Sequence, residues 1–384
     1  MMIKTVNLGE LISPAKVRRC NDDEYPVLSM TMHDGIVLQS ERFKKSLASL
    51  DQSNYKVVSR GQLVVGFPID EGVIYVQNAA DEGIMSPAYG VWDIHAEKVL
   101  PEYLECCLHS PQSMSYYMSK LKGTTARRRS ITTEDLLSLP ISLPDKSEQR
   151  RRLSLLSSCK DTISKSEQQL AKLDELVKSR FVEMFGDPIS HLDRGETKQL
   201  DRIAERITVG FVGEASNDYV EAGVPYLRTQ NVRVNHIDLE GLIYVNESFH
   251  KKNSKSIIRP GDIVISRVGA NRGMAAVIPE SLPEANIANC LIVGRTNLID
   301  SCYLAFYLNM SYGKRPQFGA SVGSAQGVVN TSVLKKWEIY VPEKKEQKEF
   351  VEYVNQVDKS KLAVKQSLEK LETLKKSLMQ QYFG

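Results

Sequence analysis

Polar side chains able to hydrogen-bond flat ring edges gather in short loops in the second half of the chain. They lie in the stretches PYLRTQN, SRVGANRG and GSAQG, where glycines and polar residues interrupt apolar runs. Arginine pairs with the edge of guanine, and asparagine or glutamine with the edge of adenine. These residue types therefore suit the reading of base edges in DNA. The candidates are Arg228, Gln230, Asn231, Arg267, Asn271, Arg272, Ser324 and Gln326.

The first half of the chain supplies a smaller polar set and a basic run. A basic run suits DNA phosphates, which position a protein on the duplex without specifying its sequence. The alternative is that polar loops and a short basic run are solvated surface, and the sequence leaves both interpretations open. The candidates are Thr31, His33, Gln39, Lys120, Lys122, Arg127, Arg128 and Arg129.

Patterns typical of catalysis or metal binding do not occur in the sequence. The six cysteines form no CxxC pair, and no histidine stands at zinc-ligand spacing. The sequence contains no Asn/Asp-Pro-Pro-Tyr/Phe motif for a flipped adenine and no Walker A loop. Pro144-Asp145 could begin a nuclease motif, but its repeat partner is Pro342-Glu343, which favours helix capping. We expect no catalytic residue, metal or cofactor in this chain.

A repeat of half the chain length organises these loops. Two segments align without a gap at a shift of 198 positions, ending at Gly186 and Gly384. Each begins with Pro-x-x-x-Glu-Gln and ends with Phe-Gly. A period this long indicates two copies of one structural unit.

Both repeated segments predict long helices, because residues 147–185 and 344–383 contain neither glycine nor proline. Acidic residues at capping-box spacing mark the starts, Asp145 with Glu148 and Glu343 with Glu346. Apolar residues recur at alternating spacings of three and four, which is typical of a coiled coil. Two ordinary amphipathic helices within globular folds are the alternative. The expected seam is Leu156, Cys159, Ile163, Leu170, Leu173, Val177 and Met184, and, 198 positions on, Val354, Val357, Val364, Leu368, Leu371 and Leu378, interrupted by Lys361 and Lys375.

The segment before each helix predicts a module of mixed helices and strands. Short alternating stretches such as GVIYVQ and GDIVIS are separated by Gly, Pro, Asn and Asp, and VVSRGQLVV repeats as IIRPGDIVI. We therefore expect an α/β (α+β) fold with an internal pseudo-two-fold repeat, in which an antiparallel coiled coil joins two globular domains. The expected division is residues 1–143 and 187–341 for the domains, and 144–186 and 342–384 for the helices.

Composition agrees with a soluble protein of two globular units. The chain has 384 residues, 42% of them hydrophobic, and a formal net charge of +3, too small to indicate a nucleic-acid partner. The first residues, MMIKTVNLGELI, lack the apolar core of a signal peptide, and no run of 18 apolar residues follows. We expect a cytoplasmic protein that does not contact the membrane.

The order of module, helix, module, helix resembles the specificity subunits of type I restriction-modification systems. The likeness extends over the whole chain, and GSAQGVVN, RPGDIVISRVGANRG and FVEMFGDP carry it most specifically. The first module departs from the pattern, with GTTARRRSIT in place of GSAQGVVN and GFPIDEG in place of SRVGANRG. Gln326 in GSAQGVVN has two interpretations: it reads an adenine, or it holds its own loop.

The resemblance implies a non-catalytic subunit whose two target-recognition domains each read half of a bipartite site in double-stranded DNA. The paired helices would set the half-site spacing and dock two methyltransferase subunits that carry S-adenosylmethionine. Restriction subunits would carry ATP and Mg²⁺. The alternative is a coiled-coil adaptor that binds other proteins.

Overall fold

The computed structural model describes residues 3–21, 24–42, 52–121, 129–188, 196–311 and 329–384. The chain divides into two compact units. Unit 1 comprises Met1–Gln168 and Val364–Gly384, and unit 2 comprises Gln169–Ala363. Each unit thus combines one globular segment with parts of both long helices. The predicted four-part division by chain segment stays a prediction.

Unit 1 is built on a four-stranded antiparallel sheet in the order β2-β9-β6-β7. Alternate residues face two cores: Leu63 and Trp92 pack with the helices α2 (Pro101–Leu108) and α3 (Pro111–Lys120), and Val64 and Val91 pack on the opposite side. The strands of unit 1 are β1 (Lys4–Asn7), β2 (Ile12–Pro14), β3 (Leu28–Met30), β4 (Ile36–Leu38), β5 (Lys56–Ser59), β6 (Leu63–Val65), β7 (Ile74–Val76), β8 (Glu82–Met85), β9 (Gly90–Ile94) and β10 (Pro140–Leu143). Outside the main sheet, β1 pairs with β10, β3 with β4, and β5 with β8.

The helices of unit 1 begin where the sequence supplies starting residues. Proline occupies the first position of both α2 and α3, where its missing N–H costs nothing. The Ser110 hydroxyl accepts from the Ser113 N–H at 3.2 Å and caps α3. The helices are α1 (Gln39–Arg42), α2 (Pro101–Leu108), α3 (Pro111–Lys120) and α4 (Thr133–Leu137), with 3-10 turns η1 (Leu8–Glu10) and η2 (Ile69–Glu71).

Unit 2 repeats the same sheet order and adds a second sheet. The four strands β12-β22-β19-β20 correspond to the four of unit 1, and a five-stranded sheet follows the order β13-β17-β14-β21-β18. Within the second sheet, β14 pairs with β21 in parallel. The strands are β11 (Thr197–Gln199), β12 (Ile207–Val209), β13 (Tyr219–Val220), β14 (Val224–Leu227), β15 (Val232–Arg233), β16 (His236–Ile237), β17 (Ile243–Val245), β18 (Ile257–Ile258), β19 (Ile263–Ser266), β20 (Ala275–Val277), β21 (Ala285–Ile287), β22 (Cys290–Val293) and β23 (Glu338–Tyr340).

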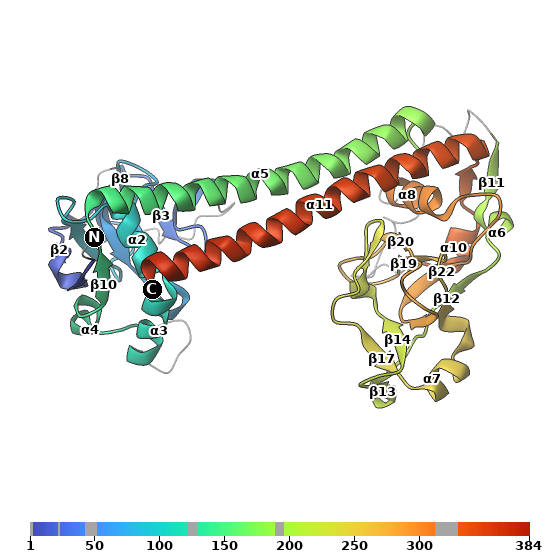
Figure 1. Ribbon diagram of the computed structural model, residues 1–384, viewed down its shortest axis with the longest axis horizontal. Coiled ribbons are helices and arrows are strands. Elements are labelled where there is room, and N and C mark those ends of the chain that lie inside the picture. The colour runs from blue at the N-terminus through green and yellow to red at the C-terminus, as the bar shows by residue number, and fades with distance from the viewer. Residues whose placement is uncertain (1–2, 22–23, 43–51, 122–128, 189–195, 312–328) are drawn as a thin grey trace. The chain divides into compact units, whose positions relative to one another are not determined.

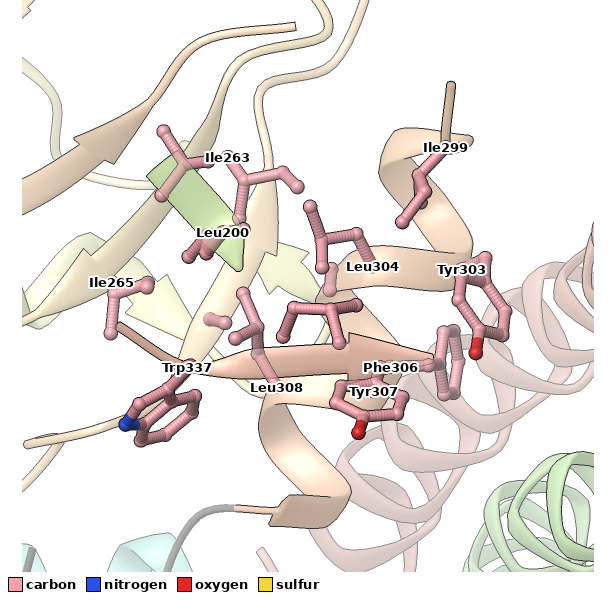
Figure 2. Close-up of a cluster of buried hydrophobic side chains, with 14 of the residues drawn as sticks. Leu200, Ile263, Ile265, Ile299, Tyr303, Leu304, Phe306, Tyr307, Leu308 and Trp337 are labelled. Carbon is pink, nitrogen blue, oxygen red and sulfur yellow. The ribbon is translucent and has the colours of Figure 1, made fainter. Parts of the chain in front are cut away.

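The central strands of unit 2 are buried on both faces, because α8 (Ser301–Ser311) covers one face and strands of the second sheet cover the other. Ile263 and Ile265 of β19 pack in the core that contains α8, while Val264 packs in the opposite core. Figure 2 shows Leu304 and Leu308 of α8 on the side of Ile263 and Ile265, with Leu200 and Trp337 near these two isoleucines. The remaining helices are α6 (Leu200–Ile203), α7 (Glu247–Lys252) and α10 (Thr331–Lys335), with 3-10 turns η4 (Ser216–Asp218), η5 (Thr229–Asn231) and η6 (Ser254–Ser256).

The two predicted long helices are present as α5 (Lys146–Phe185) and α11 (Lys344–Phe383). In unit 1 the beginning of α5 packs on the end of α11, and in unit 2 the end of α5 packs on the beginning of α11, so the helices are antiparallel. Figure 1 shows them side by side within each unit. The predicted seam positions are buried or half-buried throughout. The fold class, including the coiled coil, is confirmed.

A lysine that interrupts the apolar seam is accommodated by a carboxylate. Lys361 of α11 is half-buried, and its Nζ lies 2.6 Å from Oδ1 of Asp174 on α5. The long aliphatic stem of lysine can pack in the seam while its charged end reaches a partner. The predicted interruption is therefore part of the helix contact.

The two helix starts use the predicted capping residues in different ways. In α5, Oδ1 of Asp145 accepts the N–H groups of Ser147 and Glu148, both at 2.9 Å. Glu148 does not return a bond to the cap and instead binds two arginines. In α11 the contact is reversed, because the Glu343 N–H donates to Oε2 of Glu346 at 3.1 Å. Each helix thus makes half of a capping box.

The glutamine of the repeated Pro-x-x-x-Glu-Gln motif joins each helix to its globular segment. Gln149 accepts the Leu100 N–H at 2.9 Å and donates to the Pro144 carbonyl at 2.9 Å. Gln347 accepts the Asp300 N–H at 2.8 Å and donates to the Pro342 carbonyl at 2.8 Å. Both side chains are buried, so each amide satisfies backbone groups that water does not reach.

Candidate functional site

Two of the predicted polar loops of unit 2 lie against each other. The first is η5 with the preceding Arg228, at the end of β14, and the second is the loop of residues 267–273 that follows β19. The Asn271 Nδ2 donates to the carbonyl oxygens of Thr229 at 3.2 Å and of Val232 at 3.1 Å. One amide therefore ties together loops that come from two different sheets.

The first of these loops is also held from within. Asn231 is 3% exposed; its Oδ1 accepts the Arg228 N–H at 2.9 Å and its Nδ2 donates to the Asp238 carbonyl at 3.0 Å. The amide groups of Asn231 and Asn271 are thus used inside the protein. The structure gives both asparagines a positioning role in the loop cluster, and their predicted contact with DNA stays a prediction.

A third segment, the turn between β21 and β22, completes the cluster. Asn289 has a φ of 51°, a left-handed conformation that asparagine tolerates better than most residues. Its carbonyl accepts the Arg267 N–H at 3.2 Å, and its own N–H donates to the Phe211 carbonyl at 2.9 Å. Sequence reasoning missed this residue, although an asparagine between two apolar stretches is a typical turn signal.

Two of these loops, η5 with Arg228 and the turn at Asn289, line a pocket of about 550 Å³ in unit 2. Polar side chains contribute to its wall, and the buried residues Ala215 and Ala288 contribute small side chains. Its lining is Gly213, Glu214, Ala215, Ser216, Tyr219, Tyr226, Arg228, Thr229, Gln230, Ala288 and Asn289. The predicted residues Arg228 and Gln230 therefore face one common space.

Charge and burial distinguish the three predicted arginines of unit 2. The Nε of Arg228 is shielded from solvent and has no hydrogen-bond partner among the described residues. The Nε of Arg267 donates to the Val329 carbonyl at 3.3 Å, and Arg272 lies half-buried in the same loop. Burial raises the pKa of Tyr226, beside Arg228, to about 12, so the Tyr226 hydroxyl is neutral at physiological pH.

The predicted polar residues of unit 1 occupy the β3–β4 hairpin and the start of α1, which follows it. Thr31 closes the turn between β3 and β4, because its Oγ1 donates to the Gly35 carbonyl at 3.0 Å and accepts the Asp34 N–H at 2.8 Å. His33 is exposed in this turn. Gln39 is 8% exposed, and its Nε2 donates to Oγ of Ser29 at 3.3 Å. Of the three, His33 is the side chain that solvent reaches most freely.

The described members of the basic run form ion pairs within unit 1. Lys120 ends α3, and its Nζ lies 3.5 Å from Oδ1 of Asp135. Arg129 lies 2.6 Å from Oδ2 of Asp70 and 3.3 Å from Oε1 of Glu71, both in η2. Three members of the run lie outside the described residues, namely Lys122, Arg127 and Arg128. The same holds for two predicted residues of the second half of the chain, Ser324 and Gln326. The run is therefore partly engaged with the protein's own carboxylates.

Within the described ranges, no three His, Cys, Asp or Glu side chains gather into a group that could hold a metal ion. No helix among these residues has the length and apolar character needed to cross a membrane.

Comparison with known proteins finds a family model that matches part of the second half of the chain. Residues 196–374, which contain the loop cluster, match the family model of the type I restriction modification DNA specificity domain. The resemblance to type I specificity subunits predicted from the sequence is thereby confirmed.

Curated relatives share the same description. The MjaVIII specificity subunit of Methanocaldococcus jannaschii is 22% identical over 69% of this chain and 65% of its own length. The HindI specificity subunit of Haemophilus influenzae is 24% identical over 48% of this chain and 41% of its own length. The matched stretch thus spans less than two-thirds of either relative.

Solved structures extend the likeness in fold to the whole chain. A chain from a study of complex assembly and conformational transition of the type I R-M system has a TM-score of 0.63, with 19% identity over 99% of this chain and 97% of that one. The S subunit of a type I system from M. genitalium has a TM-score of 0.51, with 15% identity over 100% of this chain and 96% of that one. The fold of these solved structures therefore extends over the whole chain, including both globular segments and both long helices.

Proposed function

We propose that this chain, which carries a type I restriction modification DNA specificity domain at residues 196–374, is the DNA-reading subunit of a type I restriction-modification complex. Each globular segment acts as a target-recognition domain and reads one half of a bipartite site in double-stranded DNA. The internal repeat supports two readers, because the main sheets of units 1 and 2 have the same strand order.

The loop cluster of unit 2 is the observation that carries this proposal. Three loops that begin at the ends of β14, β19 and β21 meet in one place, and Asn271 ties two of them together. They present an arginine and a glutamine whose side chains can donate and accept hydrogen bonds at base edges. Loops held rigidly in this way can read a sequence with little loss of conformational entropy on binding.

The chemistry belongs to partner proteins in this proposal. Two methyltransferase subunits dock on the paired helices and bring S-adenosylmethionine for adenine methylation, and restriction subunits bring ATP and Mg²⁺. This chain contributes no catalytic residue and binds no cofactor. It works in the cytoplasm, where the host DNA is. The helices set the distance between the two half-sites.

The test is a domain exchange. Residues 1–142 are replaced by the corresponding segment of a relative with a different site, and methylated adenines are mapped in a genome that expresses the complex. We expect one half of the methylated site to change and the other half to remain. The matched control exchanges residues 187–341 and should change the opposite half. A change in both halves, or no methylation that depends on this chain, would contradict the proposal.

A further inference from the structure

We infer that the pocket of unit 2 is a subsite for the major-groove edge of a single guanine, with the Arg228 guanidinium as the group that reads it. This inference rests on the proposed function and adds a residue and a base to it. The pocket lies within one unit and is lined by the end of β14, by η5, by the segment after β12 and by the turn at Asn289.

One N–H of the Arg228 guanidinium lacks a hydrogen-bond acceptor in the part of the chain that the structure describes. Its Nε is shielded from solvent yet has no partner among the described residues. By contrast, Arg206 lies 2.8 Å from Oδ2 of Asp262 and Arg259 lies 2.6 Å from Oε2 of Glu284 in the same unit. A buried N–H without a partner is costly, so this side chain gains by turning toward acceptors that a ligand brings into the pocket that it lines. The O6 and N7 atoms of guanine are the acceptors that an arginine fork matches best.

The charge of the pocket favours a base over a phosphate. Arg228 is balanced by the exposed carboxylate Glu214 on the same lining, which would repel a phosphate. The other polar lining groups, Ser216, Thr229 and Gln230, are neutral and suit the mixed donors and acceptors of base edges. We therefore expect the pocket to bind a base edge and not a backbone phosphate.

Apolar side chains at the rim support the same assignment. Tyr219 lines the pocket and is 41% exposed, and Val212, next to the lining residue Gly213, is 63% exposed. Exposed apolar groups beside a polar pocket suit the ring faces of bases and the methyl group of thymine. A neighbouring A·T pair could therefore contact this rim while the arginine reads the guanine.

The position of Arg228 is set before any ligand arrives. Its backbone N–H is bound by Asn231, and the carbonyl of the next residue, Thr229, is bound by Asn271. Tyr226, 2% exposed, packs with Phe249 at a ring distance of 5.6 Å and supports the strand that leads into Arg228. Specificity at a single base requires this kind of rigid support, because a displaced guanidinium would lose one of its two bonds.

The experiment measures sequence preference directly. The full-length chain with its methyltransferase subunits selects duplexes from a random-sequence DNA library, and bound DNA is sequenced for wild type, Arg228→Ala, Arg228→Lys and Arg202→Ala. Arg202 is the matched control, because it is an exposed arginine of α6, which does not line the pocket. Thermal unfolding of each protein is measured in parallel.

We expect Arg228→Ala and Arg228→Lys to reduce the preference for guanine at one position by about 5- to 150-fold and to leave the other positions unchanged. Arg228→Lys keeps the charge but loses the two-pronged geometry, so its binding to non-specific DNA should match wild type. Arg202→Ala should keep the wild-type preference.

Three results would overturn the inference. If Arg228→Lys retains the guanine preference, the arginine is only a point charge. If the variants weaken all sequences equally or lose thermal stability with no change in preference, Arg228 is a structural residue or a phosphate contact. In both cases wild type still selects a sequence, so the proposed function stands. If wild type selects no sequence, the proposed function itself is wrong.

Discussion

Positions 152 and 350 correspond in the repeat and are both buried, but one is an arginine and the other a phenylalanine. In unit 1, Arg152 is 5% exposed and donates to the Tyr382 carbonyl at 2.6 Å, to the Tyr103 hydroxyl at 3.3 Å and to Oε1 of Glu148 at 2.9 Å. In unit 2, Phe350 is fully buried. The main sheets of the two units thus share a strand order, but the corresponding buried helix position holds a hydrogen-bonded cation in unit 1 and an aromatic ring in unit 2.

The surroundings of each position explain why the exchange is tolerated. Around Phe350, the rings of Phe181, Phe185 and Phe306 lie at centroid distances of 5.4, 5.6 and 5.3 Å. Around Arg152, the Tyr382 ring lies 5.0 Å from the guanidinium carbon. An aromatic face can pack on another ring or on a cation, so the same kind of wall accepts both residues. Repeated architecture therefore does not require repeated residues.

The largest expected effect is at Phe350. We expect Phe350→Ala to lower the free energy of unfolding of unit 2 by about 3–5 kcal/mol, because it removes a fully buried ring from a packed cluster. Urea unfolding gives the size of the loss, and hydrogen exchange followed by mass spectrometry assigns it to unit 2. Phe350→Leu is the control and should cost less, because it refills most of the space.

The comparison predicts that this loss stays local. Amides of unit 1, including those around Arg152, should keep their wild-type protection in Phe350→Ala. Equal loss of protection in both units would mean that they unfold as one body, and the two positions could not then be compared as independent solutions.

The repeat and its helices could be predicted because they depend on local rules. The absence of Gly and Pro over residues 147–185 and 344–383 predicted α5 and α11 almost to the residue. The difference between Arg152 and Phe350 could not be anticipated, since it depends on contacts with Tyr382 and Phe306, which are remote in the sequence. Tertiary packing decides such positions.

The candidate site was predictable as a set of loops but not as a set of roles. The loops expected in PYLRTQN and SRVGANRG follow strands β14 and β19, which take in the first residues of each stretch, and the structure brings the two loops together. The sequence does not show whether an asparagine amide faces outward or binds nearby backbone, and Asn231 and Asn271 do the latter. Asn289 was missed because its contribution is a backbone conformation.

A smaller and symmetrical effect is expected at the repeated glutamines. Gln149→Ala and Gln347→Ala each leave a buried backbone N–H and a carbonyl without their amide partner. We expect each to cost about 1–3 kcal/mol of unfolding free energy in its own unit. Gln168→Ala, at an exposed position of α5, should have almost no effect. Urea unfolding with hydrogen exchange of each unit measures all three. Unequal losses at Gln149 and Gln347 would show that the two contacts are not equivalent.

The smallest expected effect is the pH dependence of the contribution that Glu148 makes to the stability of unit 1. Glu148 binds Arg151 at 2.6 Å and Arg152 at 2.9 Å, and these hydrogen bonds lower the pKa of its carboxyl to about 2. In an unfolded chain the pKa of glutamate is about 4.3. Because the folded pKa is the lower one, the stabilising contribution of Glu148 is fully present above about pH 4.3 and is lost as the pH falls toward 2. Arg151 is 54% exposed, so solvent screens part of this interaction.

Glu148→Gln should therefore lower the stability of unit 1 at pH 7, and its difference from wild type should shrink steadily between about pH 4.3 and pH 2. Urea unfolding of both proteins across this range gives the difference directly. Phe350→Leu is the control, because it removes no titratable group and its cost should not vary with pH in this way. If the difference in unfolding free energy between Glu148→Gln and wild type stays constant from pH 7 to pH 3, the charge of Glu148 does not stabilise unit 1. Arg152 would then be held by Tyr103 and Tyr382 alone, and the two units would differ in shape rather than in electrostatics.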